Sequence, residues 1–171
     1  MSMILILESV SANVAVDNRE RTTIPFNSAA GWGAGMLVGP EEDEDNMISL
    51  EKAWHGLHFL LTGDPWGGAG YQAFLLCGGT EQGEDMGYGP ARFFDVDEVR
   101  DIHKVLDPIT ADQLWSRFDA ERMAEADIYG AHWDDEEESD LQEEYLEYFT
   151  MLKQFISETA SEGNSLRITM T

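Results

Sequence analysis

The chain has 171 residues, 43% of them apolar, and a formal net charge of −24, with 34 acidic residues against 10 lysines and arginines. This length and apolar content are typical of one globular domain with its own core, and they exclude a chain that is disordered throughout. So negative a field repels nucleic acids and anionic membranes, and it attracts basic proteins. We therefore expect no nucleic-acid partner and no membrane partner.

Cys77 is the single cysteine, which excludes a disulfide within the chain and a cysteine-based zinc site. A lone thiol is typical of a reducing cytoplasm. The apolar run of residues 3–7 has no basic flank and is too short for a signal peptide or a membrane span. We expect a soluble cytoplasmic protein.

The first part of the chain combines one strand with a long irregular stretch. Residues 3–9 are apolar on both faces and β-rich, which predicts an inner strand. Residues 11–48 show no strong period, and we predict loop there with a short strand at 36–38. This stretch contains GWGAG, which lacks the spacing of a dinucleotide-binding fingerprint, and five consecutive acids, Glu41 to Asp45.

Residues 49–63 are predicted to form a helix. Ser49 is a suitable N-cap, Gly63 is suited to end the helix in the left-handed conformation, and Leu50, Trp54 and Leu57 recur at helical spacing. Further along, the pattern predicts a strand at 71–77, a short strand at 93–94, a capped helix from Asp95 to Asp107, a helix after Thr110 that includes Met123, a long helix at 140–161 and a last strand at 165–170.

Strands at both ends of the chain, with the helices gathered between them, indicate a single α+β domain. We predict a small mixed sheet that joins the N- and C-terminal strands and is packed by about four helices. The helix at 49–63 should pack on this sheet, with Trp54 buried and its loss costing about 3–5 kcal/mol. His55 should be more exposed, and its replacement should cost far less.

Several motifs resemble one bacterial family. LEKAWHGLHFLLTG, LLCGG, GYGPARFFDVDEV and ADIYGAHW are similar to segments of the YfbM-like family, a domain of unknown function (DUF1877). The resemblance covers the first strand and residues 47–171, so we predict that residues 10–46 are an insertion peculiar to this chain. It implies an α+β fold and no established reaction.

Two histidines three residues apart, His55 and His58, are the first candidates for chemistry. With Glu51 they fall on neighbouring helical turns, where they would suit a metal or proton transfer. The spacing is not HExxH, however, and His58 falls at the edge of the apolar stripe. We favour a structural role, and only a structure can show whether His103 or His132 joins them.

The segment GYGPAR places Tyr88 and Arg92 on either side of a tight glycine turn. Arg92 has the geometry to bind an anion through two hydrogen bonds. An arginine in so acidic a chain will also readily find a carboxylate within the fold, and we favour that structural interpretation. We predict no metal site and no cofactor.

The acidic residues of the second half gather in one run, which comprises Asp134, Asp135, Glu136, Glu137 and Glu138 and continues to Asp140. A solvated face that aids solubility is the plainest interpretation. A calcium loop is less consistent, because the DxDxDG pattern with its distal glutamate is absent. The remaining interpretation is a docking surface for a basic protein.

Two hypotheses about function follow. The first is a non-catalytic binding module, such as an inhibitor or immunity-type partner of a basic protein, whose acids at 134–138 meet the partner. The second is an enzyme or small-ligand binder with a pocket near His58, Tyr88 and Arg92. A broad acidic face favours the first, and a deep pocket that gathers those three residues favours the second.

Overall fold

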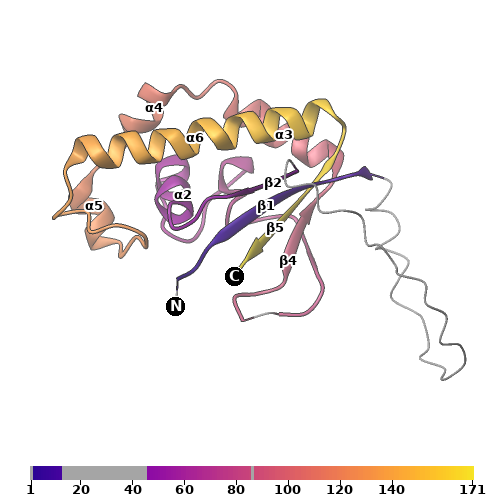
Figure 1. Cartoon of the computed structure of the whole chain (residues 1–171), viewed down its shortest axis with the longest axis horizontal. Helices are drawn as coiled ribbons and strands as arrows, with labels where there is room; N and C mark the ends of the chain where they lie inside the picture. Colours follow the sequence, from indigo (N-terminus) through magenta and orange to yellow (C-terminus); the bar gives the residue numbers. More distant parts are fainter. Residues whose placement is uncertain (1, 13–45, 86) are drawn as a thin grey trace, which may run out of the picture.

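The computed structural model describes residues 2–12, 46–85 and 87–171. These residues form five strands, five α-helices and one 3-10 helix, labelled as in Figure 1. In chain order they are β1 (Leu5–Val10), β2 (Met47–Ser49), α2 (Trp54–Thr62), η2 (Tyr71–Ala73), β3 (Thr80–Gln82), β4 (Ala91–Phe94), α3 (Val96–Leu106), α4 (Ala111–Trp115), α5 (Ala120–Glu125), α6 (Glu138–Ser161) and β5 (Ser165–Met170).

The five strands form one sheet in the order β2-β1-β5-β4-β3. Strands β1 and β5 pair over their whole length, from Leu5 opposite Met170 to Val10 opposite Ser165. This confirms that the first and last predicted strands share a sheet. We expected a mixed sheet, but all four strand pairs are antiparallel. The central strand β5 joins the β2–β1 pair to the β4–β3 pair.

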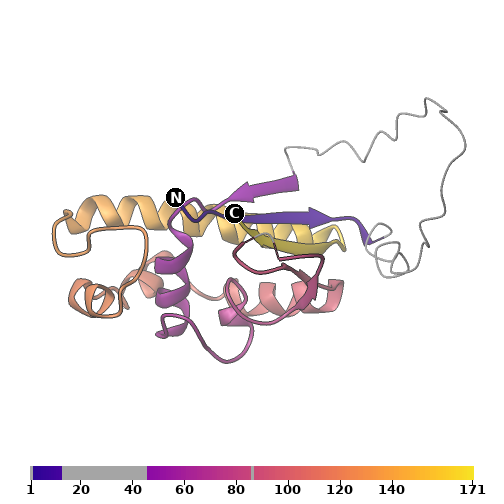
Figure 2. The ribbon, with the colours of Figure 1, turned by 90° about the horizontal axis from the view of Figure 1, so that it is seen from below.

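One face of the sheet is buried and the other is partly open. Leu5 and Leu7 of β1 are buried, while Ile6 and Glu8, which alternate with them, are half-buried, so β1 is an inner strand with only one fully covered face. On the open face Glu8 forms an ion pair with Arg167 of β5. Figure 2 shows α2, α3 and α5 on one side of strands β1 and β5, and Figure 1 shows the long helix α6 running along this group.

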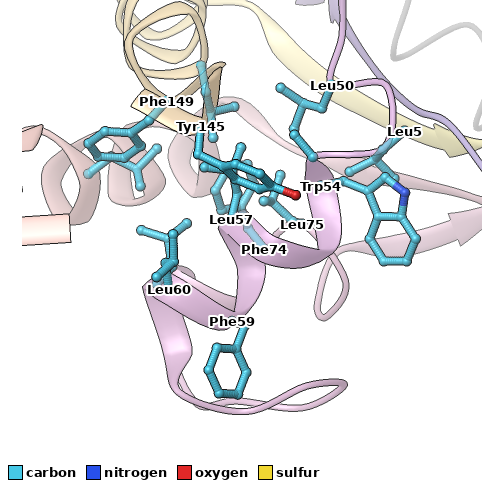
Figure 3. Packing of buried hydrophobic residues seen from close by; sticks show 14 of the residues in the cluster. Leu5, Leu50, Trp54, Leu57, Phe59, Leu60, Phe74, Leu75, Tyr145 and Phe149 are labelled. Carbon is cyan, nitrogen blue, oxygen red and sulfur yellow. The ribbon is translucent and has the colours of Figure 1, made fainter. Parts of the chain in front are cut away.

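Helix α2 lies at the centre of the core. Trp54, Leu57 and Leu60 are fully buried, and the Nε1–H of Trp54 donates to the carbonyl of Met3 at 3.1 Å, which joins α2 to the start of β1. Figure 3 shows Trp54 beside Leu5, with Phe149 of α6 on the other side of Leu57 and the ring of Tyr145 between Phe149 and Trp54 in this view. The buried face predicted for this helix is confirmed.

The start of α2 differs from the prediction. Ser49 ends β2 opposite Ile6, and a turn precedes the helix, which begins at Trp54 without a side-chain cap. The Ser49 hydroxyl instead accepts from the backbone N–H of Glu51 at 3.1 Å. Residues that pair with β1 cannot also be helical, so sheet pairing overrides the local capping signal.

The strand predicted at 71–77 is wrong. This segment is η2 followed by helical turns, with Phe74 N–H donating to Tyr71 and Cys77 N–H donating to Ala73. Phe74 and Leu75 are nevertheless buried. A short apolar run without alternation fits a buried strand and a buried helical turn equally well, and here the turn is the structure.

The capping signals of the second half are confirmed. Asp95 with Glu98 and Thr110 with Gln113 both form complete capping boxes. The helix predicted after Thr110 is divided into α4 and α5, because Asp119 accepts from the backbone N–H of Arg122 and begins a second helix. The strand predicted at 36–38 and most of the predicted insertion at 10–46 lie outside the described residues.

Candidate functional site

Both histidines of the predicted pair lie on α2, and both are fully buried, with 0% of each residue exposed. The expectation that His55 is the more exposed and that His58 lies at the margin is therefore wrong. Residues 64–70 fold back over this side of the helix and bring carbonyl groups to both rings. Helical periodicity alone does not reveal such a covering segment.

His55 is bonded at both ring nitrogens. Its Nε2 lies 2.6 Å from the carbonyl of Pro65, and its Nδ1 accepts from the backbone N–H of Tyr129 at 2.9 Å. The ring is therefore neutral, with its proton on Nε2. It lies against the rings of Trp54 and Trp66, with centroids 4.8 and 4.3 Å away. Burial lowers the pKa of His55, and the bond to Pro65 partly opposes this.

His58 binds the same covering segment, residues 64–70, at a second carbonyl group. Its Nε2 lies 2.8 Å from the carbonyl of Gly67, while its buried Nδ1 has no hydrogen-bond partner among the described residues. Burial lowers the pKa of His58, and the hydrogen bond to the Gly67 carbonyl partly opposes this. The ring is therefore neutral and donates through Nε2, which leaves Nδ1 as an unpaired acceptor within the described part of the chain.

Arg92 of β4 is half-buried against residues 74–78, whose carbonyl groups accept from its guanidinium. Its Nη1 donates to the carbonyls of Phe74 at 3.0 Å and Gly78 at 3.2 Å, and its Nη2 donates to that of Leu75. Burial lowers its pKa to about 10, so the guanidinium stays charged at neutral pH. The ion pair that we favoured for Arg92 is absent from the described residues, and backbone carbonyls take the place of the carboxylate.

Tyr88 lies apart from this arrangement, in the loop before β4, and is 42% exposed. The loop is shaped by Asp85, whose carboxylate accepts from the backbone N–H groups of Gly87 and Gly89, which lowers the pKa of Asp85. The structure thus brings His58 and Arg92 together around the segment 64–79. None of the three cavities described below is lined by these two residues or by Tyr88.

The acidic loop, defined here as residues 134–140, is exposed at every position. Figure 1 places it at one end of the molecule, where it leads from the region of α5 into α6. Trp133 anchors the loop, since its ring is buried and its Nε1–H donates to the carbonyl of Ile128 at 2.7 Å. Exposed acids of α6, Glu143 and Glu144, continue the negative surface.

Two of the five predicted partner-binding acids also hold the fold. The carboxylate of Glu136 accepts from the backbone N–H of His132 at 2.8 Å, and that of Glu138 accepts from the indole N–H of Trp115 at 3.3 Å. The carboxylates of Asp134, Asp135 and Glu137 have no hydrogen-bond or ion-pair partner in the described part of the chain. These three are therefore the acids available to a partner.

A hollow of about 190 Å³ opens beside the acidic loop. Its surface is mostly polar, and three aspartates are among its lining residues. The lining residues are Ala124, Asp127, Ile128, Ala131, His132, Trp133, Asp134 and Asp135. Sequence periodicity did not indicate this hollow, because its two sides come from α5 and from the loop anchored by Trp133.

A larger cleft, of about 520 Å³, lies between the end of α2 and the turn that joins α4 to α5. Its lining combines apolar side chains with two guanidinium groups, those of Arg117 and Arg122, neither of which the sequence analysis singled out. A third cavity, of about 260 Å³, is lined by four glycines with Tyr71, Phe74, Cys77, Phe94 and Glu98. Within the described ranges, no three His, Cys, Asp or Glu side chains are grouped to hold a metal ion.

The comparisons with known proteins agree with this fold. The model of the family described as "Domain of unknown function (DUF1877)" matches residues 1–169. The chain belongs to the DUF1877 family. The matched range includes residues 10–46, so the family model extends through the predicted insertion.

A DUF1877 fold is also found in a crystal structure of YfbM from Escherichia coli, a protein of unknown function. The two share 16% identity with a TM-score of 0.64, over 98% of this chain and 99% of that chain. At this identity the likeness shows the fold alone. The comparison with proteins of curated function gave no match. No described helix of this DUF1877 chain is long and apolar enough to cross a membrane.

Proposed function

We propose that this DUF1877 protein is a non-catalytic binding module that docks a basic protein through its acidic loop. The observation that carries the proposal is the state of Asp134, Asp135 and Glu137: all three are exposed, and none has a partner in the described part of the fold. Three carboxylates held close together without counter-charges are costly to a compact acidic protein unless a cation meets them.

We expect the hollow beside the loop to favour a partner by its shape as well as by its charge. Its accessible surface is mostly polar, and the carboxylates of Asp127, Asp134 and Asp135 suit the cationic head of a lysine or arginine. A basic side chain from the partner would enter the hollow and pair its charge with these carboxylates.

The net charge of −24 also favours a basic partner, because it would raise the rate of association. A field of this strength attracts a basic surface before contact and raises the association rate, and salt screens it over about 8 Å at physiological ionic strength. Solubility alone needs a much smaller net charge. Fast association that slows as salt is added is therefore the expected signature.

The test uses one variant that removes only the acids without a structural contact. Asp134→Asn, Asp135→Asn and Glu137→Gln together remove three charges and leave Glu136 and Glu138 in place. The matched control, Glu81→Gln, Glu84→Gln and Glu158→Gln, removes the same charge from exposed positions elsewhere. Each immobilised protein is exposed to a lysate of its source organism, and the association rate of any retained protein is then measured with both components purified.

We expect a basic protein to be retained by the original chain and by the control, and to be lost from the acidic-loop variant. Its association rate should fall steeply with added salt and fall again in that variant, while urea unfolding stays unchanged. A retained protein whose association rate changes neither with salt nor with the three substitutions would contradict the proposal. So would a capture that does not differ between the two variants.

A further inference from the structure

We propose that the cleft between α2 and the α4–α5 turn is a binding site for a small organic monocarboxylate with a flat apolar body. The cleft, of about 520 Å³, is large enough for such a ligand and is lined by Phe59, Leu60, Leu61, Thr62, Gly63, Ser116, Arg117, Phe118, Asp119 and Arg122. It does not share a lining residue with the hollow beside the acidic loop, so this proposal is independent of the partner proposed above.

Arg117 is fixed in the cleft by its own hydrogen bonds. Its Nη1 donates to the carbonyls of Leu60 at 3.1 Å and Leu61 at 3.2 Å, at the end of α2. The negative end of the α2 dipole and the guanidinium thus stabilise each other. The Nη2 and Nε groups of Arg117 make no hydrogen bond in the described part of the fold, so one edge of a positioned guanidinium remains for a ligand.

Arg122 supplies a second cation. Its guanidinium carbon lies 5.7 Å from the centre of the Phe59 ring, and no described carboxylate lies within ion-pair distance of it. In a chain with 34 acids, a lone exposed guanidinium in a cleft is unexpected. Asp119 lies at the rim, but its carboxylate accepts from the backbone N–H of Arg122 as the cap of α5.

The cationic groups are peculiar to this cleft. Neither the hollow beside the acidic loop nor the cavity near Cys77 is lined by a lysine or an arginine. Arginines that line a cleft are suited to bind a carboxylate, since each guanidinium offers paired N–H donors in a plane.

The aromatic walls of the cleft indicate which kind of group is attached to the carboxylate of the ligand. Phe59 is almost fully buried and Phe118 is half-buried, and the Phe118 ring is stacked on that of Trp115 at 4.3 Å with an angle of 9°. A flat apolar body would lie against Phe118, the more exposed of the two rings, while its carboxylate reaches the arginines. A single negative charge fits better than a phosphate, because repulsion by the net charge of −24 grows with the charge of the ligand.

The test follows the Nε–H resonances of the arginine side chains by NMR on the whole protein. Benzoate is the probe, benzamide is its neutral counterpart of the same shape, and acetate is the carboxylate without the ring. Benzoate should shift the resonances of Arg117 and Arg122, acetate should shift them only weakly, and benzamide should leave them unchanged.

Arg122→Gln should weaken benzoate binding about tenfold, which is the change expected when one charge-assisted hydrogen bond is lost. Arg122→Lys keeps the charge without the planar group and should bind with intermediate affinity. Arg100→Gln, which removes an exposed arginine paired with Asp97, is the matched control and should bind as the original chain does.

Arg122 donates no side-chain hydrogen bond in the described residues, so Arg122→Gln should leave the urea unfolding curve unchanged. Three outcomes would overturn the site: no shift at Arg117 and Arg122 with millimolar benzoate, equal shifts with benzamide, or equal affinities in Arg122→Gln and Arg100→Gln. None of these bears on the basic partner of the acidic loop.

Discussion

Replacing His55 with alanine should lower the free energy of unfolding by about 3–5 kcal/mol. The substitution leaves the Tyr129 N–H and the Pro65 carbonyl without their partner, and each loss costs about 1–1.5 kcal/mol where the groups are only partly buried. It also leaves a space between the rings of Trp54 and Trp66, which adds about 1–2 kcal/mol. The cost should approach that of Trp54→Ala, which removes a fully buried ring.

The measurement is urea unfolding at pH 7.5, followed by circular dichroism and by tryptophan fluorescence. His132→Ala is the control, because this histidine is exposed and its side chain makes no hydrogen bond in the described residues, so the change should stay within about 0.5 kcal/mol. If His55→Ala costs no more than His132→Ala, the two hydrogen bonds contribute nothing and our account of the covering segment is wrong.

Three further predictions concern the same core. Arg92→Met should cost about 3 kcal/mol, because three backbone carbonyls lose their donor; thermal unfolding measures this, and a change below 1 kcal/mol would contradict it. Gly56→Ala should cost about 1–3 kcal/mol, because an added Cβ would lie 2.4 Å from Cε1 of Tyr145; an unchanged urea midpoint would show that the ring moves aside freely. Burial lowers the pKa of His55 and His58, so the unfolded chain binds more protons than the folded chain just below pH 6.5, and the free energy of unfolding should fall as the pH drops from about 6.5 toward the lower folded pKa values. His55→Gln should flatten this dependence on pH in urea titrations between pH 7.5 and 5. An equal slope in both proteins would contradict the prediction.

The features that were predicted correctly from the sequence are mostly those that depend on interactions between residues close together in the chain. The capping boxes at Asp95 and Thr110 form because each needs residues only three positions apart. The strands at the two ends of the chain pair in one sheet as expected. The strand expected at 71–77 failed because its apolar run has no period, and because the donor that stabilises its helical turns, Arg92, lies further along the chain.

The site residues were harder to predict, because their partners are distant in the chain. The amide that donates to His55 belongs to Tyr129, 74 positions away. Arg117 contacts carbonyls 56 and 57 positions before it, so its place in a cleft with Arg122 has no signal in the local sequence. A residue pattern shows which face of a helix is apolar, but it does not show which loop folds back onto that face.

The central place of β5 in the sheet has a consequence for synthesis. About 155 residues separate the end of β1 from the start of β5, and at about 5–20 residues per second the ribosome needs about 8–30 s to make them. Until then β1 has only the short β2 beside it, and β4 lacks its longer neighbour. A nascent chain with such open strand edges is prone to pair with other chains. Strong mutual repulsion between chains that each carry many carboxylates would keep them apart during this interval, so the acids for which we propose a basic partner would also protect the chain while it is being made.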